Sequence, residues 1–81
     1  MSKFHLSVAD KLRVQLDGLT DRFNELAQAE RDAYDSHSDA WLESRAAEKW
    51  ETYVCQIEEA AELLNQALSA MEDGLEAAED D

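Results

Sequence analysis

The stretch AEKWETYVCQIEEAAELLNQALSAMEDGLEAA, residues 47–78, carries the strongest structural signal in this sequence. Its apolar residues follow one another at alternating steps of three and four, which places them on one stripe of an α-helix. The unbroken run spans more than four heptads and favours a coiled-coil-like helix. The stripe consists of Ala47, Trp50, Val54, Ile57, Ala61, Leu64, Leu68, Met71, Leu75 and Ala78.

The N-terminal half repeats the same spacing at Ala9, Leu12, Leu16, Leu19, Phe23 and Leu26. We therefore predict helices at 8–33 and 39–78, joined by a polar connector at 34–38. So short a connector makes consecutive helices antiparallel neighbours. The predicted fold is a single all-α domain, 1–81, built as an antiparallel helical hairpin. The acidic residues 79–81 oppose the helix dipole and are expected to fray.

The two predicted helices differ in length, at roughly 40 Å and 60 Å for a rise of about 1.5 Å per residue. A hairpin would cover the longer helix only to about residue 66, and its apolar stripe would continue uncovered. Because uncovered stripes mark association surfaces, we predict a symmetric homodimer that forms a four-helix bundle. The predicted association seam consists of Trp50, Val54, Ile57, Ala61, Leu64, Leu68, Met71 and Leu75.

Composition excludes several classes of protein. One cysteine among 81 residues cannot form an internal disulfide, and a chain with two glycines and no proline has few turn formers for a β-sheet. The net charge of -13 disfavours direct binding to nucleic acid or to an anionic membrane. No signal peptide or membrane-spanning run is visible, and Cys55 lacks an export context, so we expect a cytoplasmic protein.

Acidic residues are concentrated toward the C-terminus. Residues 1–50 contain 10 acidic and 7 basic residues, whereas residues 51–81 contain 10 acidic residues and no basic one. We define the acidic surface as Glu51, Glu58, Glu59, Glu62, Glu72, Asp73 and Glu76. Neighbours on it lie about 5–6 Å apart, comparable to phosphate spacing in nucleic acid. It is either a solvated face that keeps an apolar helix soluble or a docking surface for a basic protein.

Residues that could carry chemistry are few. His5, His37 and Cys55 lack the close spacing of zinc ligands, so we predict no metal site and no cofactor. There is no phosphate-binding loop or nucleophile elbow. The acid pair Glu58 and Glu62 has no cleft to desolvate it, and we assign Trp41, Trp50 and Tyr53 to packing. The sequence therefore predicts no catalytic residue and no enzyme.

Residues 34–68, YDSHSDAWLESRAAEKWETYVCQIEEAAELLNQAL, resemble short acidic proteins of phages and mobile elements. The shared features are an aromatic-Asp connector, Ser44 before a charged stretch, and a helix rich in Glu, Ala and Leu. The resemblance implies a phage-type origin, in which case the host cytoplasm is the site of action. Small acidic inhibitors of restriction or CRISPR machinery are a recurring class among such proteins.

Two functions are consistent with these features. The first is a non-enzymatic inhibitor whose acidic surface occupies a basic nucleic-acid-binding protein. The second is a structural adaptor whose association seam recruits a partner helix, with the charge providing solubility only. Salt separates the two, because electrostatic docking weakens with ionic strength and apolar association does not.

Overall fold

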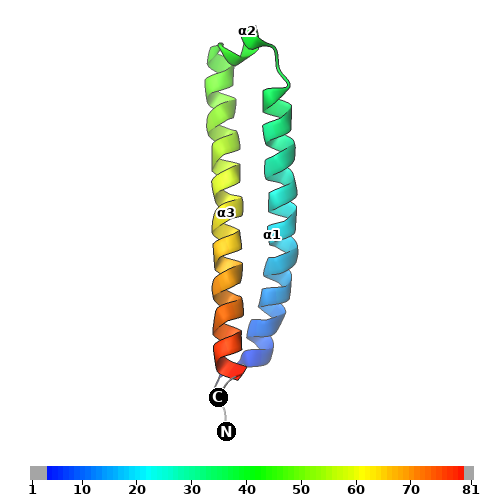
Figure 1. Cartoon of the computed structure of the whole chain (residues 1–81), viewed down its shortest axis with the longest axis vertical. Helices are drawn as coiled ribbons and strands as arrows, with labels where there is room; N and C mark the ends of the chain where they lie inside the picture. The colour runs from blue at the N-terminus through cyan, green and yellow to red at the C-terminus, as the bar shows by residue number, and fades with distance from the viewer. Residues whose placement is uncertain (1–3, 80–81) are drawn as a thin grey trace.

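The computed structural model describes residues 4–79 and contains the helices α1 (Leu6–Asp35), α2 (Asp39–Leu42) and α3 (Arg45–Glu79). The long helices α1 and α3 lie side by side and antiparallel, with α2 at the turn (Figure 1). They form a rod of 64 × 16 × 15 Å. No strand occurs within residues 4–79. The predicted all-α class and the helical hairpin are thus confirmed.

The connector is more structured than predicted. Residues 39–42 form the single turn α2, which Ser38 caps by accepting the Trp41 N–H at 3.3 Å. The chain then leaves the helix at Glu43 and restarts at Arg45, where the Ser44 hydroxyl accepts the Ala47 N–H at 3.3 Å. A predicted helix running unbroken from 39 is therefore wrong at its start, because two serine caps divide it.

The first helix is longer than predicted at both ends. It begins at Leu6 instead of residue 8 and extends to Asp35. Its C-terminal turn is closed by the Ser36 N–H, which donates to the Asp32 carbonyl at 3.0 Å. At the other end of the molecule, α3 continues to Glu79; the predicted fraying of residues 80–81 lies outside the described residues.

These bounds remove the predicted overhang of the second helix. The late start of α3 and the early start of α1 bring the two helices to a common end (Figure 1). Leu68, Met71 and Leu75 are half-buried within the single chain. The expectation that they extend uncovered beyond residue 66 is wrong, because it rested on the predicted helix lengths.

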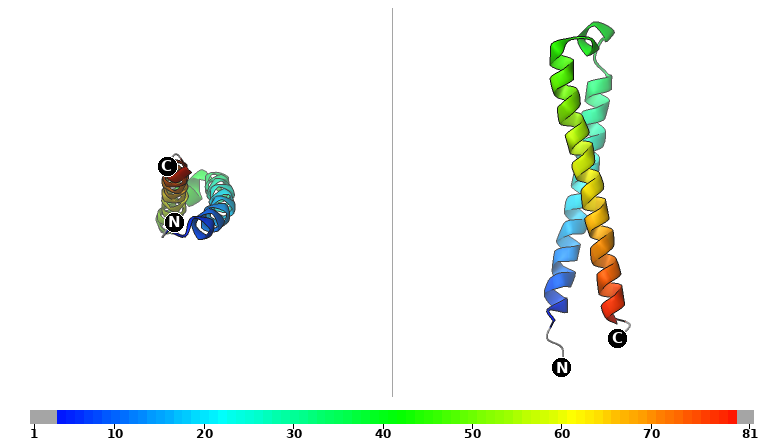
Figure 2. Two further views of the ribbon diagram at one scale, coloured as in Figure 1. Left: turned by 90° about the horizontal axis from the view of Figure 1, so that it is seen from below. Right: turned by 90° about the vertical axis from the view of Figure 1, so that its left-hand side faces the viewer.

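Small side chains occupy the centre of the helix pair. The buried residues within 4–79 are Thr20, Ala27, Ala47, Val54 and Ala61. Their size allows the two backbones to approach closely, and the helices cross gently along their length (Figure 2). The Thr20 hydroxyl satisfies its hydrogen-bonding capacity by donating to the Leu16 carbonyl at 2.7 Å.

The predicted stripe of α1 is rotated relative to the observed one. Thr20 and Ala27 face α3, whereas Leu12, Leu19 and Leu26 are 53%, 45% and 39% exposed. On α3 the residues predicted to form an association seam between chains face α1 of the same chain: Val54 and Ala61 are buried, and Ile57, Leu64 and the C-terminal members are half-buried. Trp50 is the exception, at 46% exposed.

Candidate functional site

Polar pairs connect the two helices along one side of the hairpin. Arg31 donates from Nε to Glu58 Oε2 at 3.1 Å and from Nη2 to Glu58 Oε1 at 2.7 Å. The amides of Asn24 and Asn65 exchange hydrogen bonds of 3.0 and 3.4 Å. We letter the seven positions of each heptad a to g, with Thr20 of α1 and Val54 of α3 at position a. Asn24, Arg31, Glu58 and Asn65 then all occupy position e. They therefore define one flank of the helix pair, and the g positions define the other.

The acidic surface lies on this polar side of α3. Its seven residues occupy positions e, b and f, which adjoin one another around the helix. Six are exposed, and Glu58 is partly covered by its contact with Arg31. Hydrogen bonding to the Arg31 guanidinium lowers the pKa of Glu58. Among the ion pairs of residues 4–79, this is the only one that the acidic surface forms.

Helix α1 extends the negative charge across the same side of the molecule. Six of its acidic residues also occupy positions e, b and f. They are Asp10, Asp17, Asp21, Glu25, Asp32 and Asp35. The sequence alone gives no signal for this, because periodicity within α1 does not say which side of the hairpin its acidic residues share with α3. The hairpin thus has one broad acidic face contributed by both long helices.

The opposite flank contains no aspartate or glutamate in α1 or α3. We call it the acid-free flank and define it by positions g and c of both helices. In α1 these are Val8, Leu12, Gln15, Leu19, Arg22, Leu26, Ala29 and Ala33. In α3 they are Ala46, Lys49, Tyr53, Gln56, Ala60, Leu63, Ala67, Ala70, Gly74 and Ala77. Large apolar residues of α1 thus stand across from mostly small residues of α3.

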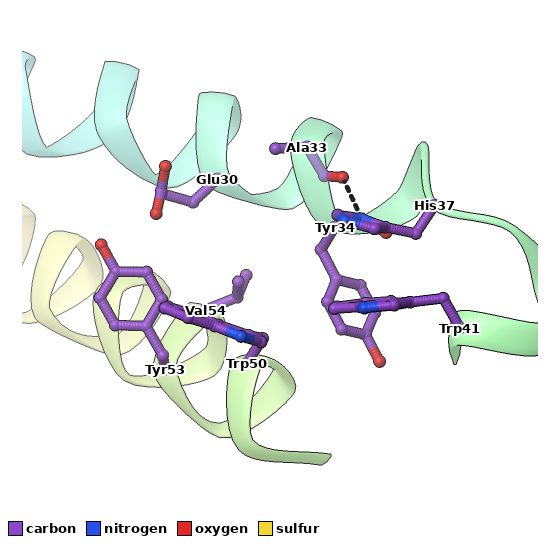
Figure 3. Close-up of a pocket in the computed structure, with 8 residues that line it drawn as sticks. All are labelled: Glu30, Ala33, Tyr34, His37, Trp41, Trp50, Tyr53 and Val54. Atoms are coloured by element: carbon purple, nitrogen blue, oxygen red, sulfur yellow. Dashed lines mark hydrogen bonds between the residues drawn. The ribbon is translucent and has the colours of Figure 1, made fainter. Parts of the chain in front are cut away.

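A cavity opens at the turn end of the hairpin (Figure 3). Tyr34, Trp41, Trp50 and Tyr53 line it, together with the carboxylate of Glu30. The sequence predicts a packing role for Trp41, Trp50 and Tyr53 and gives no signal for Glu30 or Tyr34. Trp50 and Tyr53 remain 46% and 36% exposed, so packing within the chain covers them only in part.

The candidate metal ligands do not come together. Cys55 is exposed on α3, with Arg31 Nη2 3.8 Å from its sulfur, and His37 lies at the turn. Within residues 4–79 no three His, Cys, Asp or Glu side chains are grouped as a metal site would require. Neither α1 nor α3 has a segment of the length and apolarity needed to cross a membrane.

Comparison with known proteins adds no family to this description. No family model, characterised protein or solved structure matches the chain.

Proposed function

We propose that this chain is a non-enzymatic binding protein whose acidic surface docks on a basic nucleic-acid-binding protein and competes with its nucleic acid. One observation carries the proposal. The seven residues of the acidic surface lie on one face of α3, six acidic residues of α1 extend the charge beside them, and Glu58 alone among the acidic surface is neutralised by an ion pair. From residue 51 to residue 76 this face extends about 38 Å at about 1.5 Å per residue.

The charges that remain unpaired would attract a basic partner collectively. Each exposed pair contributes only about 0–1 kcal/mol, so affinity depends on the number of carboxylates and no single one dominates. Docking of this kind accelerates association and weakens with added salt. Small acidic inhibitors of restriction or CRISPR machinery would act in this way.

The test compares two sets of four substitutions that remove equal charge. Glu58 stays unchanged, because its loss would break the contact with Arg31. One variant neutralises the acidic surface at Glu59→Gln, Glu62→Gln, Glu72→Gln and Glu76→Gln. The control variant neutralises exposed carboxylates of α1 at Asp17→Asn, Asp21→Asn, Glu25→Gln and Asp32→Asn.

The readout is displacement of labelled duplex DNA or RNA from the proteins that the wild-type chain captures from the native host lysate. At low salt the acidic-surface variant should displace nucleic acid at least about tenfold less effectively than wild type. The control variant should lose less of its displacement activity than the acidic-surface variant does. If wild type and the acidic-surface variant displace nucleic acid equally well, the acidic surface does not dock on the partner and serves solubility only.

A second function, self-assembly, is favoured by the acid-free flank. Two copies with a net charge of -13 each repel one another on most approaches, but on this flank no carboxylate of α1 or α3 opposes contact. A two-fold axis would place Leu12, Leu19 and Leu26 of one copy against Ala60, Ala67 and Gly74 of the other. We propose a homodimer of this kind, a four-helix bundle in which the part of the flank between Leu12 and Leu26 is covered.

The exposed surface is consistent with this assembly. The chain exposes 6371 Å², whereas a compact monomer of this mass exposes about 4900 Å². A stable interface buries about 1200–2000 Å² in total, which a flank running along both helices can supply. The two functions are compatible, since the acidic surface lies on the other side of the hairpin.

Two matched substitutions test the homodimer by sedimentation at micromolar concentration. Leu19→Glu places a charge on the acid-free flank, and Val14→Glu places the same charge at an exposed position outside it. Leu19→Glu should give monomers, and Val14→Glu should sediment as wild type does. A wild-type protein that is monomeric, or equal behaviour of the two variants, would contradict this interface.

A further inference from the structure

The aromatic residues of this chain gather at one place. The sequence contains two tryptophans, two tyrosines and two phenylalanines, and both tryptophans and both tyrosines line the cavity at the turn. They come from three elements: Tyr34 from α1, Trp41 from α2, and Trp50 and Tyr53 from α3. Antiparallel pairing and the short turn α2 are what bring them together.

The rings form two walls (Figure 3). On one side Tyr34 and Trp41 stand edge to face, with centroids 5.7 Å apart and planes at 72°. On the other side Trp50 and Tyr53 stand edge to face, with centroids 5.6 Å apart and planes at 89°. Perpendicular rings present both faces and edges to the space between them, which is the arrangement of an aromatic cage.

The wall at the turn also includes His37, which lines the cavity beside Trp41. The His37 ring stacks on Trp41 with centroids 3.7 Å apart and planes at 21°. His37 Nδ1 in turn lies 2.8 Å from the Ala33 carbonyl oxygen, to which it donates. Trp41 is therefore fixed before any ligand arrives, which lowers the entropic cost of binding.

A carboxylate gives this cavity a preference for positive charge. Glu30 is half-buried among the aromatic rings, and the Tyr53 hydroxyl points toward it in Figure 3. Interaction of the Tyr53 hydroxyl with the Glu30 carboxylate, together with burial, raises the pKa of the tyrosine. The two oxygens of a carboxylate offer about four acceptor positions, more than one tyrosine hydroxyl can occupy, so Glu30 can also face a cation.

Cations of the chain itself already lie over two of these rings. Arg31 Cζ is 5.6 Å from the centroid of Tyr34, and Lys49 Nζ is 5.6 Å from that of Trp50. Neither residue lines the cavity. The cavity measures about 140 Å³, roughly the space of five water molecules at about 30 Å³ each. That is room for a trimethylammonium head group but for little more.

We propose that the cavity formed by Tyr34, Trp41, Trp50, Tyr53 and Glu30 is a binding site for a methylated ammonium cation. The methyl groups contact the ring faces, whose negative quadrupole stabilises the charge, and Glu30 supplies the counter-charge. Either a free quaternary ammonium compound or a methylated lysine side chain carries this chemistry. The site is separate from the acidic surface and does not depend on the function proposed for it.

The binding test uses the fluorescence of Trp41 and Trp50, the only tryptophans of the chain, both of which line the cavity. The probes are choline and neohexyl alcohol, its uncharged analogue in which carbon replaces nitrogen. Choline should give a saturable change and bind at least about tenfold more tightly than neohexyl alcohol. Equal binding of the two probes, or no saturable change with choline, would overturn the proposal.

Matched variants separate the cavity from the general negative charge of the protein. Glu30→Gln should weaken choline binding several-fold, whereas Glu62→Gln removes the same charge outside the cavity and should leave it unchanged. Trp50→Leu should weaken binding at least about tenfold. Because Trp50 is half-exposed, circular dichroism should show that this variant retains its helices. If Glu30→Gln and Glu62→Gln weaken choline binding equally, choline is held by the general negative charge of the protein and the cavity is not a specific site.

A second pair of probes identifies the source of the cation. A short peptide with one trimethyllysine is compared with the same peptide carrying unmodified lysine, and both are compared with choline. Preference for the trimethylated peptide over the unmodified one supports the site. If the trimethylated peptide also binds more tightly than choline, the ligand is a protein side chain. If it binds no more tightly than choline, the ligand is a small quaternary ammonium compound.

Discussion

Arg31 and Glu58 join the two long helices through a pair of parallel hydrogen bonds, of 2.7 and 3.1 Å. The guanidinium fork matches the carboxylate, and this geometry is the more stabilising form of an exposed ion pair. The contact occurs in the rotation of α1 that turns Thr20 and Ala27 toward α3.

We expect this pair to give folding stability a specific dependence on pH. Arg31 lowers the pKa of Glu58 below its ordinary value of 4.5. The stabilisation is therefore fully present above that value and is lost as the pH falls through the lowered pKa. Glu58→Gln should be less stable than wild type in urea unfolding at pH 7, and the difference should shrink toward pH 3.

Glu62→Gln is the matched control for this pH experiment, since it removes one charge from the same helix without breaking an ion pair. It corrects for the relief of charge repulsion that acid produces in a chain of net charge -13. The two variants should diverge at pH 7. An identical pH profile for both would show that the contact with Arg31 contributes nothing to stability.

Thr20→Val should maintain or raise stability. Thr20 is 1% exposed, and its hydroxyl bonds only to the Leu16 carbonyl of its own helix. A methyl group in its place adds apolar contact, with a gain of up to about 1 kcal/mol. Thr52 makes the same type of bond to Glu48 on the exposed face, so Thr52→Val should change little. Urea unfolding measures both, and a clear loss for Thr20→Val would assign the hydroxyl a structural role.

Ser44→Ala should destabilise the start of α3. The Ser44 hydroxyl accepts the Ala47 N–H at 3.3 Å, and its loss leaves that amide without its capping partner. The expected cost is about 1 kcal/mol in chemical unfolding. Ser69→Ala, at an exposed position inside α3, provides the comparison and should be neutral or slightly stabilising. Equal effects would mean that the cap at Ser44 does not matter to stability.

Gly18→Ala should raise stability by about 1 kcal/mol, because glycine is a poor helix former and an added Cβ meets nothing within 4 Å. A Cβ added at Gly74 also meets nothing within 4 Å in the same chain, but Gly74 lies on the acid-free flank. In the proposed homodimer the gain from Gly74→Ala should be smaller than that of Gly18→Ala. If Gly18→Ala lowers stability instead, the added methyl group must meet another backbone that packs against this part of α1.

The hairpin and the inward face of α3 could be predicted from the sequence alone. Residues 47–78 offer one continuous apolar stripe with acidic residues on one side and mostly small residues on the other, so the rotation that turns the stripe inward buries the most apolar area. The short polar connector then requires the helices to be antiparallel. The broken start of the second helix was missed, because the capping role of Ser44 depends on where the chain crosses between the helices.

The rotation of α1 was decided by tertiary structure. Its sequence offers two rows on either side of Leu16 and Phe23, one with Leu12, Leu19 and Leu26 and one with Thr20 and Ala27, and hydropathy alone favours the leucines. Close approach to Ala47, Val54 and Ala61 selects the smaller side chains, and Arg31 and Asn24 find their partners in the same rotation. The leucine row is thereby left exposed.

The sequence by itself thus determined what depends on local periodicity: two helices, their antiparallel order and the acidity of α3. Only the tertiary structure decided what depends on contacts between residues far apart in the chain. It placed the acids of α1 and α3 on one face, and it brought Tyr34, Trp41 and Trp50 around one cavity. Helical spacing fixes neighbours within one helix, whereas the pairing of two helices is set by the fit of their side chains.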